Sequence, residues 1–188
     1  MRTVLLALLL LVAGCGCAGL PLEGVKPETA RIEMMPGVCS GTFIGPATIL
    51  TARHCLAKDA GVIQIDGERA GYALLADDGN DHIMLRVTVR RARWAFQANK
   101  PKTGDEVFKR GNPAGLRDIL TVGRVSGWDT GRMYVDITAY KGDSGAALFD
   151  RRGRIVGVVS AIGGAESFYL LIAFDMRFTA KDWDAART

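Results

Sequence analysis

The strongest constraint on the fold is the spacing of the apolar segments, which recur about every ten positions after residue 30 and are each four to eight residues long. Glycine makes up 23 of the 188 residues and proline only 6, so the chain can turn often without having the composition of a disordered protein. Short strands at regular spacing, with turn residues between them, are typical of barrels and sandwiches. Because no amphipathic helices alternate with the strands, the pattern excludes a parallel α/β sheet.

We expect five strands before and six strands after a polar, loop-like segment at residues 95–104. They span residues 38–44, 48–51, 62–65, 72–76 and 83–89, followed by 106–109, 119–126, 133–138, 146–149, 155–160 and 168–174. Only residues 175–186 have helical spacing, with Phe178 and Trp183 positioned to dock onto the body of the protein. The sequence therefore predicts an all-β protein of two similar halves with one C-terminal helix.

The first residues have the features of an export signal, in which Arg2 supplies the positive charge and residues 4–13 form an apolar run. This run is too short to span a bilayer as a permanent helix. The sequence Leu-Val-Ala-Gly-Cys at residues 11–15 resembles the lipobox of bacterial lipoproteins. That resemblance implies that residues 1–14 are removed as a signal peptide and that the Cys15 thiol carries a lipid. A plain cleaved signal is the alternative, and in both cases the protein leaves the cytoplasm.

Residues 15–30 are polar, contain proline and lack apolar periodicity, so we expect a flexible tether there. The lipoprotein would be anchored in a membrane and face the periplasm or the cell exterior. The formal net charge is only +4, and export argues against a nucleic-acid partner. We therefore interpret the arginine-rich segments 90–93 and 151–154 as solvated hairpin faces.

Four cysteines are present, at positions 15, 17, 39 and 55. An oxidising compartment permits disulfides, and a turn at Gly45 and Pro46 would bring a strand carrying Cys39 back alongside Cys55. We therefore expect a Cys39–Cys55 disulfide that fixes the adjacent loop. Cys17 remains open between a free thiol, an intermolecular disulfide and a second lipid site.

Three separate segments carry the residue types that form an activated nucleophile. His54 directly precedes a cysteine, Asp81 directly precedes an apolar strand, and Ser144 lies in the sequence Gly-Asp-Ser-Gly between two apolar strands. A histidine can remove the serine proton while an acid fixes the imidazole tautomer. The bend at the glycines lets the N–H groups of Gly142 and Ser144 face one point, where they can stabilise an oxyanion. The weaker candidates for the acid are its neighbours Asp77, Asp78 and Asn80.

The order of these three residues and the segments around them resemble the chymotrypsin-fold, or trypsin-like, serine peptidases. The family's Thr-Ala-Ala-His-Cys motif is similar to residues 51–55, and its Asp-Leu-Ala-Leu-Leu-Lys-Val motif is similar to residues 81–87. Its Gly-Asp-Ser-Gly-Gly-Pro motif is found at residues 142–147 with alanine in the last two positions. Residues 110–116 and 120–126 also resemble the bacterial HtrA-type periplasmic proteases.

The resemblance covers about residues 31–174 and implies two packed antiparallel β-barrels of the six-stranded type, with the reactive residues in the cleft between them. We place the first barrel at residues 31–95 and the linker at residues 96–104. The second barrel and the short C-terminal helix occupy residues 105–188.

The same resemblance implies a serine endopeptidase that acts on a protein or peptide substrate. Ser144 would attack the scissile carbonyl, His54 would transfer the proton, and Asp81 would orient the imidazole. The N–H groups of Gly142 and Ser144 would form the oxyanion hole. No metal and no organic cofactor is implied.

A specificity pocket is also implied. Thr138 lies six residues before the nucleophile, at the family's pocket floor, and the pocket wall begins at Ser160, with Ile162 in place of a glycine. Threonine has no charge to bind Arg or Lys, and the branched isoleucine narrows the slot. We therefore expect a small or medium uncharged residue before the scissile bond.

Activation can be inferred from Asp143, which corresponds to the acid that a new N-terminal amine binds in the family's zymogen branch. A tethered Cys15 cannot supply that amine, and no Ile-Val-Gly-Gly-like start follows it. We therefore expect activity without further processing, with Asp143 paired internally by an arginine that the sequence does not identify.

Two other functions remain open. One is a catalytically silent lipoprotein that uses the same fold as a protein-binding module. The other is an esterase, whose nucleophile would be expected between a strand and a helix, whereas Ser144 lies between strands. We interpret His82, the second of only two histidines, as a partly buried, hydrogen-bonded residue behind the reactive site and not as a metal ligand.

Overall fold

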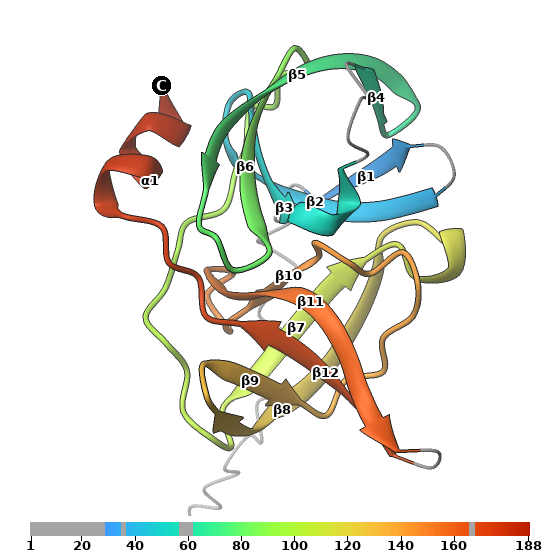
Figure 1. Ribbon diagram of the computed structural model, residues 1–188, viewed down its shortest axis with the longest axis vertical. Helices are drawn as coiled ribbons and strands as arrows, with labels where there is room; N and C mark the ends of the chain where they lie inside the picture. The colour runs from blue at the N-terminus through green and yellow to red at the C-terminus, as the bar shows by residue number, and fades with distance from the viewer. Residues whose placement is uncertain (1–28, 35–36, 57–61, 166–167) are drawn as a thin grey trace, which may run out of the picture.

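The computed structural model describes residues 29–34, 37–56, 62–165 and 168–188, which form two β-barrels and one short helix (Figure 1). Residues 1–28 lie outside the described residues, and with them the predicted signal peptide, most of the predicted tether, Cys15 and Cys17. Within the described part of the chain, no helix is long and apolar enough to cross a membrane.

Each barrel is a closed ring of six antiparallel strands, and the two rings have the same connectivity. The first has the order β1-β2-β3-β6-β5-β4 and the second the order β10-β11-β12-β9-β8-β7. The first contains β1 (Thr29–Met34), β2 (Gly37–Gly45), β3 (Thr48–Ala52), β4 (Val62–Ile65), β5 (Glu68–Asp77) and β6 (His82–Val87). The second contains β7 (Glu106–Gly111), β8 (Ile119–Asp129), β9 (Arg132–Val135), β10 (Ala147–Phe149), β11 (Ile155–Ala165) and β12 (Phe168–Phe174). The predicted all-β fold of two six-stranded barrels with a C-terminal helix is confirmed.

The strand β1 was not predicted, because its first residues fall within the predicted tether at residues 15–30. Its side chains alternate, so that Ala30 and Ile32 are fully buried in the core of the first barrel, and each is followed by a partly exposed charged residue, Arg31 or Glu33. Two buried apolar residues in a six-residue segment give too weak a period to separate a strand from a polar linker. Pairing with β2 and β4 completes the ring.

The two barrels are joined by one hydrophobic cluster that also includes the C-terminal helix. Its members include Ile44, Leu50 and Met84 from the first barrel, Phe108, Phe149 and Ile155 from the second, and Trp183 from the helix. Burial of apolar surface stabilises a fold by about 25 cal/mol per Å². A cluster of large side chains from both barrels therefore strongly favours one relative placement of the two. It brings the end of β3 and the loop before β6 close to the loop before β10.

The helix α1 (Ala180–Arg187) is shorter than the predicted segment 175–186. It begins at a capping box in which Thr179 and Asp182 satisfy each other's backbone N–H groups. Trp183 is buried, and the Phe178 ring meets it edge-on at a centroid distance of 6.1 Å, which confirms the predicted docking. In Figure 1, α1 lies beside the first barrel although it follows β12 of the second.

Candidate active site

His54 lies at the end of β3, in a single 3-10 turn (Arg53–Cys55). The next residue, Cys55, forms the predicted disulfide with Cys39 of β2, across a Cα–Cα distance of 6.1 Å. The disulfide therefore ties the turn that carries His54 to the neighbouring strand. The imidazole is partly open to solvent, with 46% of the side chain exposed.

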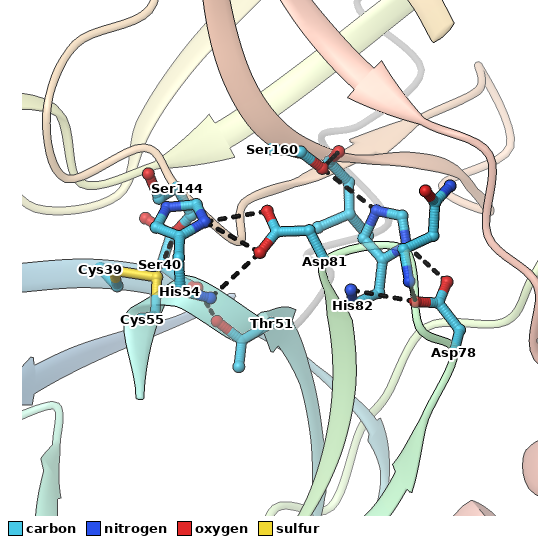
Figure 2. Close-up of polar contacts among 12 residues, drawn as sticks. Cys39, Ser40, Thr51, His54, Cys55, Asp78, Asp81, His82, Ser144 and Ser160 are labelled. Carbon is cyan, nitrogen blue, oxygen red and sulfur yellow. Dashed lines mark hydrogen bonds and ion pairs between the residues drawn. A yellow bond between two sulfur atoms is a disulfide. The ribbon is translucent and has the colours of Figure 1, made fainter. Parts of the chain in front are cut away.

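Asp81 lies directly before β6 and faces His54 (Figure 2). Its carboxylate oxygens lie 2.8 and 3.1 Å from Nδ1 of His54, and the backbone N–H of His54 donates to Oδ1 at 3.0 Å. A second backbone contact, from the N–H of Arg53 to the carbonyl of Asp81 at 2.7 Å, joins the two loops. Asp81 has a φ of +71°, in the left-handed region that aspartate tolerates better than most residues.

This contact determines the electrostatics of the imidazole. The hydrogen bond to Asp81 is the main cause that raises the pKa of His54 above its usual value of 6.5, and the negative charge adds to it, while partial burial opposes both. When Nδ1–H donates to the carboxylate, the neutral ring keeps its lone pair on Nε2. The arrangement therefore leaves a base at Nε2.

Ser144 belongs to the loop before β10, and in the view of Figure 2 it lies on the opposite side of the imidazole from Asp81. Its carbonyl accepts a 2.8 Å hydrogen bond from the N–H of Ser40, which is next to the disulfide residue Cys39. No hydrogen bond joins the Ser144 hydroxyl to His54 within the described part of the chain. Such contacts are often long in a free enzyme and tighten when substrate binds.

The backbone N–H groups of the loop around Ser144 differ in whether they have an acceptor. Within this loop, the N–H of Asp143 donates to the carbonyl of Tyr140, and the N–H of Ala146 donates to the carbonyl of Asp143. By contrast, the N–H groups of Gly142 and Ser144 have no acceptor among the described residues. Gly142 has a φ of +105°, and a Cβ at this position would collide with the carbonyl of Asn112, so only glycine fits.

Comparison with known proteins supports the resemblance seen in these segments. Residues 39–158 match the family of the trypsin-like peptidase domain. The chain belongs to this family. The match extends over parts of both barrels and includes His54, Asp81 and Ser144.

Among curated relatives, a probable periplasmic serine endoprotease DegP-like from Brucella suis biovar 1 (strain 1330) is 32% identical over 141 residues, which cover 67% of this chain and 28% of the relative. The protein of the same description from Chlamydia pneumoniae is 25% identical over 171 residues, which cover 83% of this chain and 34% of the relative. The chain thus spans no more than about a third of the length of these relatives.

Solved structures share the fold. The serine endoprotease from Yersinia pestis superposes with a TM-score of 0.73 at 20% identity, covering 89% of this chain and 65% of that one. An inactive form of a serine-to-alanine mutant of Rv3671c from M. tuberculosis H37Rv superposes with a TM-score of 0.68 at 19% identity, covering 88% of this chain and 87% of that one. The two-barrel fold of the trypsin-like peptidase domain is therefore present here.

The internal partner of Asp143 in this peptidase domain is a lysine, and the expectation of an arginine is wrong. Lys109 of β7 places Nζ 2.6 Å from Oδ2 of Asp143 and 2.8 Å from the carbonyl of Thr138, and both charged side chains are almost completely buried. The N–H of Tyr140 donates to the same carboxylate oxygen at 3.0 Å. In the sequence, Lys109 is the last residue of a predicted strand, and nothing near it indicates that it would pair with Asp143.

His82 is fully buried and forms a second aspartate–histidine pair (Figure 2). Its Nδ1 lies 2.7 Å from Oδ2 of Asp78, and its Nε2 lies 3.1 Å from the hydroxyl of Ser160. Burial raises the pKa of Asp78, but hydrogen bonds from His82 and from the N–H groups of Arg177 and Asn80 outweigh it, and the net pKa is lower than usual. The prediction that His82 is hydrogen-bonded agrees with this geometry, but the prediction that it is only partly buried is wrong, because its side chain is fully buried. The sequence did not identify Asp78 as its partner.

The predicted specificity residues are divided between two places. Thr138 and Ile162 line a cavity of about 600 Å³ next to the loop of Ser144. Ser160 is not among the described residues that line it, because its hydroxyl contacts His82 and the carbonyl of Val158. The other residues that line this cavity are Ile137, Ala139, Tyr140, Lys141, Leu170 and Leu171.

Proposed function

We propose that this chain is a serine endopeptidase in which Ser144 is the nucleophile, His54 the general base and Asp81 the residue that orients the base. The observation that carries the proposal is the Asp81 carboxylate bound to Nδ1 of His54. It is accompanied by the N–H groups of Gly142 and Ser144, which find no acceptor among the described residues. Membership of the trypsin-like peptidase family supports it. The family also implies a protein substrate.

The reaction would proceed in two halves. In the first half, the Ser144 hydroxyl attacks the scissile carbonyl and its proton passes to Nε2 of His54, while Asp81 stabilises the imidazolium. The same proton then passes to the leaving amine as the carbon–nitrogen bond breaks. In the second half, water attacks the acyl-enzyme and gives a proton to Nε2 of His54. The bond between the acyl carbon and Oγ of Ser144 then breaks, His54 returns the proton to Oγ, and the carboxylic acid is released.

Charge on the carbonyl oxygen develops in both halves and needs donors in fixed positions. The N–H groups of Gly142 and Ser144 are suited to this, since no acceptor among the described residues competes for them. Removing one such donor in a related type of site costs about 10²–10³-fold in kcat. We therefore assign these two groups to the oxyanion hole.

A fluorophosphonate probe tests the proposal. We expect the full chain to become labelled on the peptide that contains Ser144, and the Ser144→Ala variant to remain unlabelled and unable to cleave an unfolded protein substrate. The alternative, a catalytically silent lipoprotein that binds proteins, predicts no label at Ser144 in the folded wild type. Labelling on another residue would also contradict the proposal.

For the specificity, we propose that the cavity at Thr138 and Ile162 receives a small or medium uncharged side chain before the scissile bond. No acidic residue is found among the described residues that line it, so nothing there would pair with Arg or Lys. Cleavage-site profiling with a peptide library should show Ala, Val or Thr at this position. A profile dominated by Arg, Lys or Glu would refute it.

For the location, we propose that Cys15 carries a lipid and anchors the protein in a membrane, so that the barrels face the periplasm or the cell exterior. The relatives named above are described as periplasmic proteases. In the variant Cys15→Ala, acylation should be lost and the protein should be either uncleaved or soluble. Lipid attached to that variant would show that the assignment to Cys15 is wrong.

For the activation, we propose that the enzyme needs no cut near Arg31. The buried Lys109 already provides the cation next to Asp143, and the N–H of Arg31 is held in β1 by a 2.9 Å hydrogen bond to Asp66. Protein with an intact chain in this region should therefore be active. Activity that starts only after cleavage there would contradict this.

A further inference from the structure

Ser40 links the two barrels at the loop that carries Ser144. It lies in β2 of the first barrel, and its side chain is fully buried. Its hydroxyl donates to the carbonyl of Gly142 at 2.7 Å, and its N–H donates to the carbonyl of Ser144 at 2.8 Å. One residue of the first barrel therefore holds two peptide groups of the second.

The same hydroxyl also positions the loop that follows β7. It accepts hydrogen bonds from the backbone N–H of Asn112 at 2.9 Å and from Nδ2 of Asn112 at 3.0 Å. Two residues further on, the N–H of Ala114 donates to the carbonyl of Lys141 at 2.7 Å. Because the C=O and N–H of a peptide group point in opposite directions, this contact directs the N–H of Gly142 away from Ala114.

We propose that Ser40 is the positioning residue for the two N–H groups assigned to the oxyanion hole. It fixes the Gly142 and Ser144 carbonyls directly and, through Asn112 and Ala114, the Lys141 carbonyl. The N–H groups of Gly142 and Ser144 therefore lie between backbone carbonyls that residues outside the loop hold in place. This fixes the direction in which the two N–H groups point. This inference rests on the proposed function, because it concerns the oxyanion hole of the same site.

The consequence is a coupling between the barrels that acts on the transition state more than on substrate binding. The substrate side chain would enter the cavity at Thr138 and Ile162, which Ser40 does not line. Loss of the Ser40 hydroxyl frees the Gly142 carbonyl and the Asn112 loop, whereas Thr138 is held by Lys109 and Ile162 by its pairing with Leu171 of β12. Loss of an interaction made only in the transition state lowers kcat and leaves KM unchanged.

The variant Ser40→Ala tests the inference. We expect kcat for a peptide substrate to fall by about 10- to 100-fold, less than the loss caused by removing an oxyanion donor outright, with little change in KM. A peptide boronic acid, which forms a tetrahedral adduct, should lose affinity by a similar factor. The affinity for the peptide that is released as product should stay the same.

Thr42→Val is the matched control. Thr42 lies in the same strand and is fully buried, and its hydroxyl has no hydrogen-bond partner within the described part of the chain. Its kcat and boronic acid affinity should equal those of the wild type. If Ser40→Ala does not fold, Asn112→Ala removes one donor to the same hydroxyl and should lower kcat several-fold, by about half an order of magnitude, at unchanged KM.

The outcomes separate this inference from the proposed function. If the wild type does not label at Ser144, the proposed function fails. If the wild type labels but Ser40→Ala, or Asn112→Ala in its place, has unchanged kcat and boronic acid affinity, only the positioning role is overturned. Equal losses in Ser40→Ala and Thr42→Val would also overturn it, because both would then reflect a general loss of packing.

Discussion

The two histidines of this chain form the same pair with an aspartate and differ in what surrounds the rest of the ring. The Nδ1–Oδ2 distance is 2.8 Å between His54 and Asp81 and 2.7 Å between His82 and Asp78. The Nε2 atom of His54 has no hydrogen-bond partner among the described residues and 46% of the side chain is exposed, whereas His82 is fully buried. In His82 the Nε2 atom is already occupied by the hydroxyl of Ser160.

An aspartate–histidine pair is therefore not sufficient to identify a reactive base. His54 can accept a proton at Nε2 because no described residue forms a hydrogen bond with that atom. The pair at His82 instead connects the loop before β6 to β11 and, through the N–H of Arg177 bound to Asp78, to the segment before α1. We interpret it as structural, and the following predictions test that contrast.

The largest expected effect is on turnover. Asp81→Asn should lower kcat by about 10⁴-fold, because an amide leaves the imidazole in the wrong tautomer for proton transfer. Asp78→Asn should change the kcat of the folded protein far less, since His82 touches no reacting atom. Steady-state kinetics on both variants checks this. If both variants lost kcat by a similar factor, the two aspartate–histidine pairs would not differ in their contribution to turnover.

The next largest effect is on stability and has the opposite order. Asp78→Asn breaks a fully buried pair and should cost about 3–5 kcal/mol of unfolding free energy, whereas Asp81→Asn, beside a half-exposed ring, should cost less. Urea unfolding monitored by tryptophan fluorescence measures both. The double variant Asp78→Asn with His82→Leu serves as control and should recover part of the loss, because it leaves no buried imidazole without its carboxylate partner.

The disulfide distinguishes the two regions further, since it adjoins His54 and not His82. Cys39 and Cys55 are 16 positions apart, and replacing both with alanine should cost about 3 kcal/mol in the chain-entropy model. The kcat should fall as well, because the turn carrying His54 loses its tie to β2. Unfolding curves and kinetics of the double variant check both effects. An unchanged kcat would show that the hydrogen bonds to Asp81 hold the turn without the disulfide.

The smallest effect is on the pH dependence. Because Asp81 raises the pKa of His54, the acidic limb of kcat/KM should lie above pH 6.5, and it should move to lower pH in Asp81→Asn. The His54 pair stabilises the fold below pH 6.5 and loses this effect as pH rises through the raised pKa. Asp78, whose pKa is lowered from 3.8, stabilises the fold above that pH and loses the effect as pH falls. An acidic limb below pH 6.5 in the wild type would contradict the first statement.

Much of this architecture could be predicted from the sequence. Short apolar runs predict eleven of the twelve described strands. The glycines on either side of Ser144 and the cysteine after His54 identify these two segments as candidate catalytic segments from the sequence alone. The pairing of Cys39 with Cys55 also followed from export and the turn between them. These features have short-range signals, because each depends on residues that are neighbours in the chain or across one hairpin.

What could not be predicted depends on contacts between distant segments. Lys109 lies 34 residues from Asp143, and Ser40 lies 102 residues from Gly142. Nothing in the residues next to Lys109 or Ser40 distinguishes a buried partner from an ordinary strand residue. Asp78 and His82 are only four residues apart, yet the burial that makes their pair structural comes from β11 and the segment before α1.

The most direct test of the account is to trap the acyl-enzyme. The full chain is mixed with an activated peptide ester, quenched rapidly in acid, digested and mapped by mass spectrometry. We expect an acyl adduct on Ser144 that forms in the wild type, is absent in Ser144→Ala, and forms far more slowly in His54→Ala, because the serine then lacks its base. Turnover without an adduct on Ser144, or an adduct that forms equally fast without His54, would contradict it.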